Sequence, residues 1–151
     1  MLDISNVNSR QALRSVLLLM TLVPPCVLAC DCRKGSLSER IESSQIVFVA
    51  VVTEFKPLDH VTLRSKEVFK GRPDASMTIP AGMSDCDYFL PPISPRIGEA
   101  FLLFVGQLDR RLFVSRCQNS GPVLERMADL AELRRLSQLK AQSKNPANIV
   151  R

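Results

Sequence analysis

The stretch QIVFVAVVTEF, residues 45–55, decides the fold of this chain of 151 residues. It is rich in β-branched residues, which favour strands, and most of its other residues are apolar. We therefore predict a long, well-buried β-strand here, around which the rest of the chain is interpreted.

Four further segments are predicted to be strands of the same domain. HVTLRSKEVF begins with apolar residues at alternate positions and ends at the turn KGRP. AFLLFV and RLFVSR lie on either side of residues 107–110, so we predict a hairpin. The predicted strands are residues 60–69, 76–80, 100–105 and 111–116. Residues 81–98, which hold Cys86 and several prolines, are predicted to form an irregular loop.

Two helices are predicted beside these strands. Ser36-Leu-Ser-Glu39 is a capping box, and it predicts a short helix near residues 36–43. A second helix is expected from Pro122 to about Ser143, with the proline at its first position. Its expected core-facing stripe is Val123, Leu124, Met127, Leu130 and Ala131. The later leucines, Leu133, Leu136 and Leu139, drift around the helix, so its second half is expected to lean on the rim of the domain or to lie partly exposed. The elements together predict a mainly β fold, a five-stranded OB-like β-barrel with a short N-terminal helix and a C-terminal flanking helix.

The start of the chain is predicted to be an export signal. Arg10 and Arg14 precede an apolar run that is too short to span a membrane, and Pro24-Pro25 follow it. Val27-Leu28-Ala29 then offers a cleavage site directly before Cys30. An uncleaved signal anchor is the alternative. We predict a signal peptide over residues 1–29, one domain over 30–143 and a flexible tail over 144–151, in a protein that is secreted, periplasmic or part of the cell envelope.

Four of the five cysteines lie after the predicted signal. Cys26 is removed with it, which leaves Cys30, Cys32, Cys86 and Cys117. An even number of cysteines in an exported chain predicts two disulfides. A bond between Cys30 and Cys32 would close a strained small ring, so each is expected to pair with a distant partner, in either of two ways. A four-cysteine zinc site and a redox-active Cys30-Asp31-Cys32 pair are alternatives.

Composition argues against several classes of function. The net charge of +5 is spread along the chain, and with no Trp and one Tyr there is no alternation of basic and aromatic residues for nucleic acid. The single histidine, His60, cannot form a histidine metal cluster and has no nucleophile motif beside it. Asp85 and Asp87 flank Cys86 and are expected to be solvated rather than an acid–base pair. We predict a protein that is not an enzyme and that has no cofactor.

Several motifs occur in an order that is found in a known family. They are Cys30-Asp31-Cys32 after the signal, IVFVAVV, Val68-Phe69-Lys70-Gly71, Cys86 with Tyr88-Phe89, FLLFVG, and Cys117 before the last helix. Over nearly all of residues 30–136 the chain thus resembles the tissue inhibitor of metalloproteinases (TIMP) and netrin-module superfamily, N-terminal module only. The resemblance implies the disulfide pairing Cys30–Cys86 and Cys32–Cys117.

The resemblance also implies a function. TIMP-like inhibitors chelate the catalytic zinc of a metalloendopeptidase through the α-amine and carbonyl oxygen of the first cysteine, which is Cys30 here. The implied inhibitory ridge is Cys30, Asp31, Cys32, Arg33, Ser84, Asp85 and Asp87. Asp31 departs from the family, because the inhibitors usually carry a small hydroxyl residue there, and a carboxylate buried in an apolar pocket costs several kcal/mol.

Two other functions remain open at this stage. Netrin-like modules also act as non-catalytic binding domains, so an extracellular or cell-envelope protein is an alternative partner. Val27-Leu28-Ala29-Cys30 also approximates a bacterial lipobox, in which a lipid on Cys30 would anchor the chain to a membrane. Lipidation would block the chelating amine and leave an odd number of cysteines, which argues against it.

Overall fold

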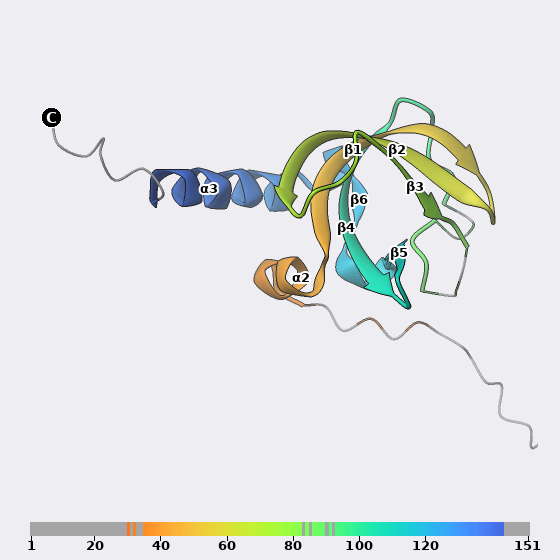
Figure 1. Ribbon diagram of the computed structural model, residues 1–151, viewed down its shortest axis with the longest axis horizontal. Helices are drawn as coiled ribbons and strands as arrows, with labels where there is room; N and C mark the ends of the chain where they lie inside the picture. Colours follow the sequence, from red (N-terminus) through yellow and green to blue (C-terminus); the bar gives the residue numbers. More distant parts are fainter. Residues whose placement is uncertain are drawn as a thin grey trace, which may run out of the picture.

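A curled antiparallel sheet forms the centre of the computed structural model, which describes residues 30, 32, 35–82, 84, 86–89, 91 and 93–143 (Figure 1). Its strands are β1 (Ile46–Lys56), β2 (His60–Lys70), β3 (Ser76–Pro80), β4 (Ala100–Leu108) and β5 (Arg111–Val114), in the spatial order β3-β2-β1-β4-β5. A two-residue strand, β6 (Gly121–Pro122), pairs with β4. The sheet curls into a half-barrel. The predicted mainly β fold of five strands, with a helix before and a helix after them, is confirmed.

The first part of β1, residues 46–52, and most of β4, residues 101–106, are buried on both faces. They pair in antiparallel register, with Phe48 opposite Leu103 and Val49 opposite Leu102. Phe48 and Leu103 point into the half-barrel, whereas Val49 and Leu102 point to its outer face. Since successive side chains of a strand alternate between faces, a strand covered on both sides needs apolar residues at every position. This explains the unbroken run IVFVAVV in β1.

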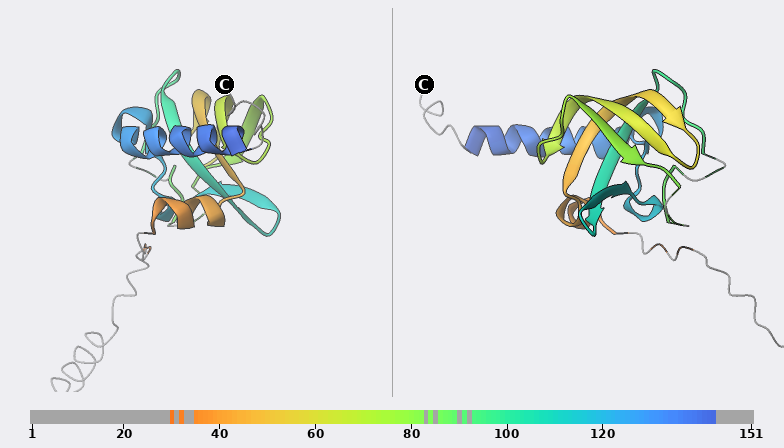
Figure 2. Two further views of the ribbon diagram at one scale, coloured as in Figure 1. Left: turned by 90° about the vertical axis from the view of Figure 1, so that its left-hand side faces the viewer. Right: turned by 45° about the vertical axis from the view of Figure 1, so that its right-hand side comes forward.

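The helices α2 (Leu37–Ser43) and α3 (Met127–Ser143) cover the outer face, and the left view of Figure 2 shows both in front of the sheet. Leu130 and Leu133 of α3 pack with Val47 and Phe104 in one buried cluster. The capping box of α2 is present as predicted, because Ser36 accepts from the Glu39 amide and donates its own amide to the Glu39 carboxylate.

The predicted start of the second helix is wrong. Pro122 is extended, with φ −52° and ψ 137°, because residues 121 and 122 pair with β4 opposite Leu102 and Phe101. A 3₁₀ turn follows, η3 (Val123–Glu125), and the α-helix begins only at Met127. Because a 3₁₀-helix and an α-helix have different numbers of residues per turn, the side chains point in other directions than they would in one continuous α-helix.

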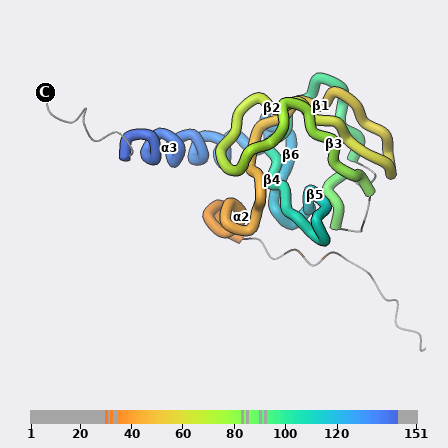
Figure 3. The backbone as a smooth tube through the Cα atoms, in the orientation of Figure 1, coloured from red at the N-terminus to blue at the C-terminus, as the bar shows by residue number. Residues whose placement is uncertain are grey.

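Three of the five residues of the predicted core-facing stripe are wrong for the same reason. Leu124 is 88% exposed, Met127 is 53% exposed and Ala131 is also exposed. Of the predicted stripe, Leu130 is buried as expected and Val123 is partly buried against the same cluster, and Leu133 completes the contact. The second half of α3 runs away from the sheet (Figure 3), and Leu139 there is 48% exposed, in line with the expected partial exposure.

An ion pair joins the two helices over the outer face. Both terminal nitrogens of Arg40 donate to the carboxylate of Asp129, at 2.8 and 3.0 Å, and the guanidinium lies 5.1 Å from the centre of the Phe104 ring. The hydrogen bonds from Arg40 hold the pKa of Asp129 below its usual value, against the opposing effect of burial. Asn119 also donates to this carboxylate.

We predict that Asp129→Asn destabilises the fold by about 2 kcal/mol at neutral pH, because it leaves the mostly buried Arg40 without its charged partner. A lowered folded pKa contributes stability above the unfolded pKa of about 3.9, and that stability is lost as the pH falls through the folded value. In urea unfolding, the free energies of unfolding of the wild type and of Asp129→Asn should therefore converge as the pH drops below about 4. Glu132→Gln, which breaks the exposed pair with Arg135, is the control and should change little. A difference in stability between the wild type and Asp129→Asn that does not change with pH would contradict the stabilising role of the Arg40–Asp129 pair.

Candidate functional site

Two disulfides attach the start of the described chain to the half-barrel. Cys30 is bonded to Cys86, with Cα atoms 5.2 Å apart, and Cys32 to Cys117, with Cα atoms 4.7 Å apart. This is the pairing that the resemblance implies. The bonds span 56 and 85 residues, so they link the segment before α2 to the loop after β3 and to the turn after β5. Disulfides of this kind are typical of an oxidising, extracellular environment.

The two disulfides lie against each other. The Sγ atom of Cys30 is 3.3 Å from that of Cys117 and 3.7 Å from that of Cys32, although it is bonded to neither. All four residues are half-buried. We call these four sulfur atoms the sulfur cluster.

The segment that carries Cys86 is fixed to the outer edge of β5. The amide of Tyr88 donates to the Val114 carbonyl at 2.7 Å, and the amide of Arg116 donates to the Cys86 carbonyl at 2.8 Å. These bonds flank an isolated antiparallel bridge between Asp87 and Ser115. Cys86 is therefore held in place by backbone contacts as well as by its disulfide.

Aromatic side chains anchor the same segment in the core. Phe89 is fully buried, and its ring centre lies 6.2 Å from that of Phe101 in β4. Tyr88 packs edge-on against Phe89 at 5.1 Å and is half-buried. Burial, with a smaller contribution from Glu125, raises the pKa of Tyr88, so its hydroxyl stays neutral in the physiological range.

Asp87 does not have the solvated side chain that was expected. It is 2% exposed, and its Oδ1 atom accepts a hydrogen bond from the Phe89 amide at 2.9 Å. Its backbone carbonyl accepts from Nε of Arg116. An Asp that bonds the backbone two residues on stabilises a turn, so Asp87 shapes the loop that presents Cys86.

The remaining predicted ridge residues divide into two groups. Ser84 is exposed, and its carbonyl accepts from the Asp87 amide at 2.9 Å, which places it beside Cys86. Asp31, Arg33 and Asp85 lie outside the described residues. The structure thus brings Cys30, Cys32, Cys86, Ser84 and Asp87 together at one edge of the half-barrel.

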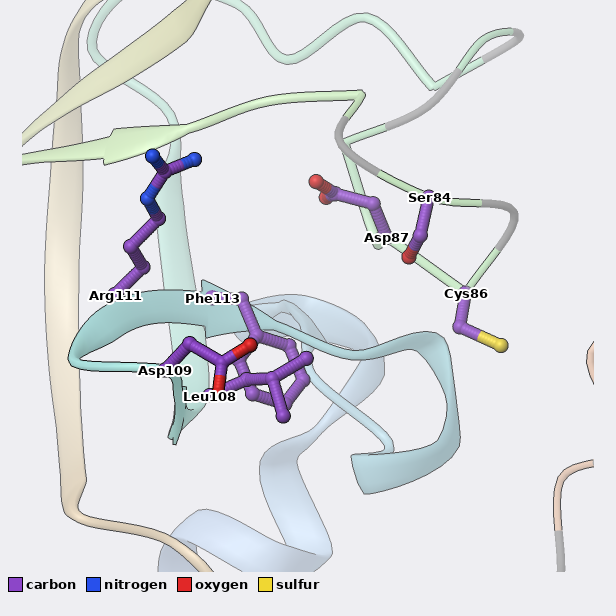
Figure 4. A pocket seen from close by; sticks show the side chains of 7 residues that line it. All are labelled: Ser84, Cys86, Asp87, Leu108, Asp109, Arg111 and Phe113. Carbon is purple, nitrogen blue, oxygen red and sulfur yellow. The ribbon is translucent and has the colours of Figure 1, made fainter.

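A cleft of about 490 Å³ lies between the Cys86 segment and the β4–β5 hairpin. Figure 4 shows Ser84 and Asp87 on one side and Asp109, Leu108 and Phe113 on the other. Leu108 is 65% exposed at the hairpin tip. A cleft lined by both apolar and polar side chains can accept a side chain of another molecule. The sequence analysis did not predict this cleft. The one signal for it was the apolar Leu108 beside the polar turn at residues 109–110.

A second cleft, of about 360 Å³, opens beside the Cys32–Cys117 disulfide. Two cationic side chains, Arg40 and Arg116, line it together with Gly35 and Asn119. Arg40 is bound to Asp129, and Nε of Arg116 donates to the Asp87 carbonyl, so both guanidinium groups are held in position.

His60 lies in a separate environment at the start of β2. Its Nδ1 atom is 3.2 Å from the Asp59 carboxylate, and its Nε2 atom is 3.7 Å from the Glu54 carboxylate. His60 lines neither of the two clefts. Among the described residues, no helix is long and apolar enough to cross a membrane.

No family model matches this sequence, and no curated protein matches it.

Each disulfide should contribute strongly to stability. We predict that Cys32→Ser/Cys117→Ser lowers the free energy of unfolding by about 4 kcal/mol, because the unfolded chain loses a long covalent loop. Cys30→Ser/Cys86→Ser should cost nearly as much, since the loop entropy depends only on the logarithm of loop length. Urea unfolding without reductant measures both losses. Ser84→Ala, an exposed change beside Cys86, is the control. Double variants as stable as the control would contradict the stabilising role.

Proposed function

We propose that the exported chain, cut directly before Cys30, inhibits a zinc metalloendopeptidase by chelating its catalytic zinc with the α-amine and carbonyl oxygen of Cys30. One observation carries the proposal. Cys30 is disulfide-bonded to Cys86, whose segment is hydrogen-bonded to β5 and anchored by the buried Phe89. The new N-terminus would therefore stand on a rigid support.

The chemistry of the proposed complex needs only groups that the cut chain would have. A catalytic zinc keeps one coordination position for water, which the amine and carbonyl of one residue can displace together. An α-amine has a pKa of about 7.7–8.0, so a useful fraction is unprotonated near neutral pH. The sulfur of Cys30 stays in its disulfide and takes no part. Because Cys30 is already fixed, binding costs less conformational entropy.

The surface beside Cys30 is suited to contact the target. Ser84 is exposed next to Cys86, and the larger cleft begins there and reaches the hairpin tip at Leu108. A side chain of the target near its zinc site would enter this cleft. The aliphatic part of that side chain would contact Leu108 and Phe113.

The length of the N-terminus provides the sharpest test of chelation. We expect a chain that begins at Cys30 to inhibit a zinc endopeptidase, and a chain that begins at Ala29 to lose at least about a hundredfold in inhibition, since its α-amine is displaced by one residue. Inhibition constants on a panel of zinc endopeptidases measure this. A serine endopeptidase is the control and should be unaffected by both chains. Intact mass and N-terminal sequencing of the exported protein show which chain exists naturally.

Asp31 determines which targets the inhibitor accepts. The residue after the chelating cysteine would enter the specificity pocket of the protease, where an unpaired carboxylate is unfavourable in apolar surroundings. We expect Asp31→Thr to lower the inhibition constant at least about tenfold against a protease with an apolar pocket. Asp74→Thr, the same change at an exposed position between β2 and β3, is the control. Unchanged or weaker inhibition would overturn this view of Asp31.

The larger cleft favours a second candidate function, that of a non-catalytic extracellular or cell-envelope binding module. A cleft of about 490 Å³ with the exposed Leu108 can bind a partner protein without a free amine. Equal binding of a partner by chains that begin at Ala29 and at Cys30 would favour this function over chelation. A lipid anchor on Cys30 is disfavoured, because the sulfur cannot form a thioether and the disulfide with Cys86 at once.

A further inference from the structure

The sulfur cluster has an arrangement that suits a metal ion when its disulfides are reduced. We infer that the reduced chain binds one zinc-like divalent ion through Cys30, Cys32, Cys86 and Cys117, a site that the proposed inhibitory function does not use. The inference rests on three features: the distances between sulfurs that are not bonded to each other, the support of the ligands by the fold, and the charge of their surroundings.

Two distances between sulfurs of different disulfides are close to those of a tetrathiolate site. A Zn–S bond of about 2.3 Å in tetrahedral geometry places neighbouring sulfurs about 3.8 Å apart. The Sγ atom of Cys30 is 3.7 Å from that of Cys32 and 3.3 Å from that of Cys117. The Sγ atoms of Cys30, Cys86 and Cys117 all lie within 4.8 Å of one another. The sulfur of Cys32 lies outside that group, so after reduction it has to move toward Cys86 to complete the site.

Two of the ligands are positioned without help from the disulfides. Cys86 and Cys117 lie on neighbouring segments that are joined by the bridge between Asp87 and Ser115 and by the bond from the Arg116 amide to the Cys86 carbonyl. These backbone bonds involve no sulfur atom. In a reduced chain that stays folded, they and the buried Phe89 keep two thiols close together, and the short segment with Cys30 and Cys32 supplies the other two.

Two cationic side chains lie beside two of the ligands. Four thiolates around a divalent cation have a net charge of −2, and nearby cations stabilise such a group. Arg40 and Arg116 line the smaller cleft, which opens on Cys32 and Cys117. This cleft also gives an ion a path to the sulfurs from solvent.

Conversion of the two disulfides to the metal site needs two added reagents, a reductant and a divalent ion. A dithiol or phosphine reduces each disulfide to two thiols and is itself oxidised by two electrons per bond. One divalent ion then replaces four thiol protons and forms four metal–sulfur bonds. Reoxidation by an added small-molecule disulfide, which accepts two electrons for each protein disulfide formed, removes all four ligands and releases the ion. The same four residues thus join the N-terminal segment to the half-barrel in both states, by covalent bonds or through the metal.

The test uses the full chain, reduced with a phosphine and titrated with Co²⁺. We expect one Co²⁺ per chain with the intense visible bands of a tetrahedral thiolate complex, displaced by one equivalent of Zn²⁺, and no such bands in the oxidised chain. Cys86→Ser and Cys117→Ser should each weaken apparent binding at least about tenfold. Cys26→Ser, which removes the cysteine outside the cluster, is the matched control and should bind like the wild type.

Circular dichroism recorded in the same titration covers the case of a reduced chain that unfolds. If Zn²⁺ restores the strand signal in the wild type but not in Cys117→Ser, the site exists and its binding is coupled to folding. Weak octahedral bands, or equal binding by Cys117→Ser and the wild type, would overturn the inference. Because the inhibitor assay uses the oxidised chain, failure of either proposal leaves the other intact.

Discussion

The burial of β1 and β4 on both faces is the constraint on which the rest of the structure depends. The inner face is closed by the curl of the sheet and by Phe89 from the loop after β3, and the outer face is covered by α2 and α3. The segments that cover the two faces also carry cysteines. The segment before α2 carries Cys30 and Cys32, and Phe89 lies three residues after Cys86. The sulfur cluster therefore forms at one edge of the sheet, where the segment before α2 meets the segment that carries Cys86.

The Cys86 segment shows how an irregular loop becomes a rigid platform. Three kinds of contact act on it: the disulfide to Cys30, the backbone bonds to β5, and the burial of Phe89. A buried aromatic side chain and a long-loop disulfide each contribute several kcal/mol, whereas a single backbone hydrogen bond contributes about 1 kcal/mol. The first two therefore hold the segment, and the hydrogen bonds set its direction. Rigidity of this origin does not require regular secondary structure, and it leaves Ser84 exposed at the edge of the larger cleft.

The sequence was sufficient to predict the elements whose signal is local. The run IVFVAVV predicted β1, the Ser36–Glu39 capping box predicted α2, and the separation of AFLLFV from RLFVSR predicted the hairpin. What it missed depends on partners distant in the sequence. Pro122 is a favourable first residue of a helix, yet pairing with β4 makes it extended. Asp87 has the sequence neighbours of a solvated loop residue, and only the docking of its loop onto β5 buries it. The larger cleft is missed for the same reason, because its two walls meet only when the sheet curls.

The sulfur of Cys30 connects the functional alternatives, because it can form only one kind of bond at a time. In the disulfide with Cys86 it fixes the residue at which the proposed cleavage would place the N-terminus, and the amine and carbonyl would be left to an external zinc. As a thiolate it would bind a metal ion within the chain itself, with three neighbours already close by. As a lipid thioether it would do neither, and Cys86 would lose its partner. The redox state and processing of one residue would therefore select among the proposed functions, while the half-barrel that positions Cys86 and Cys117 is common to all of them.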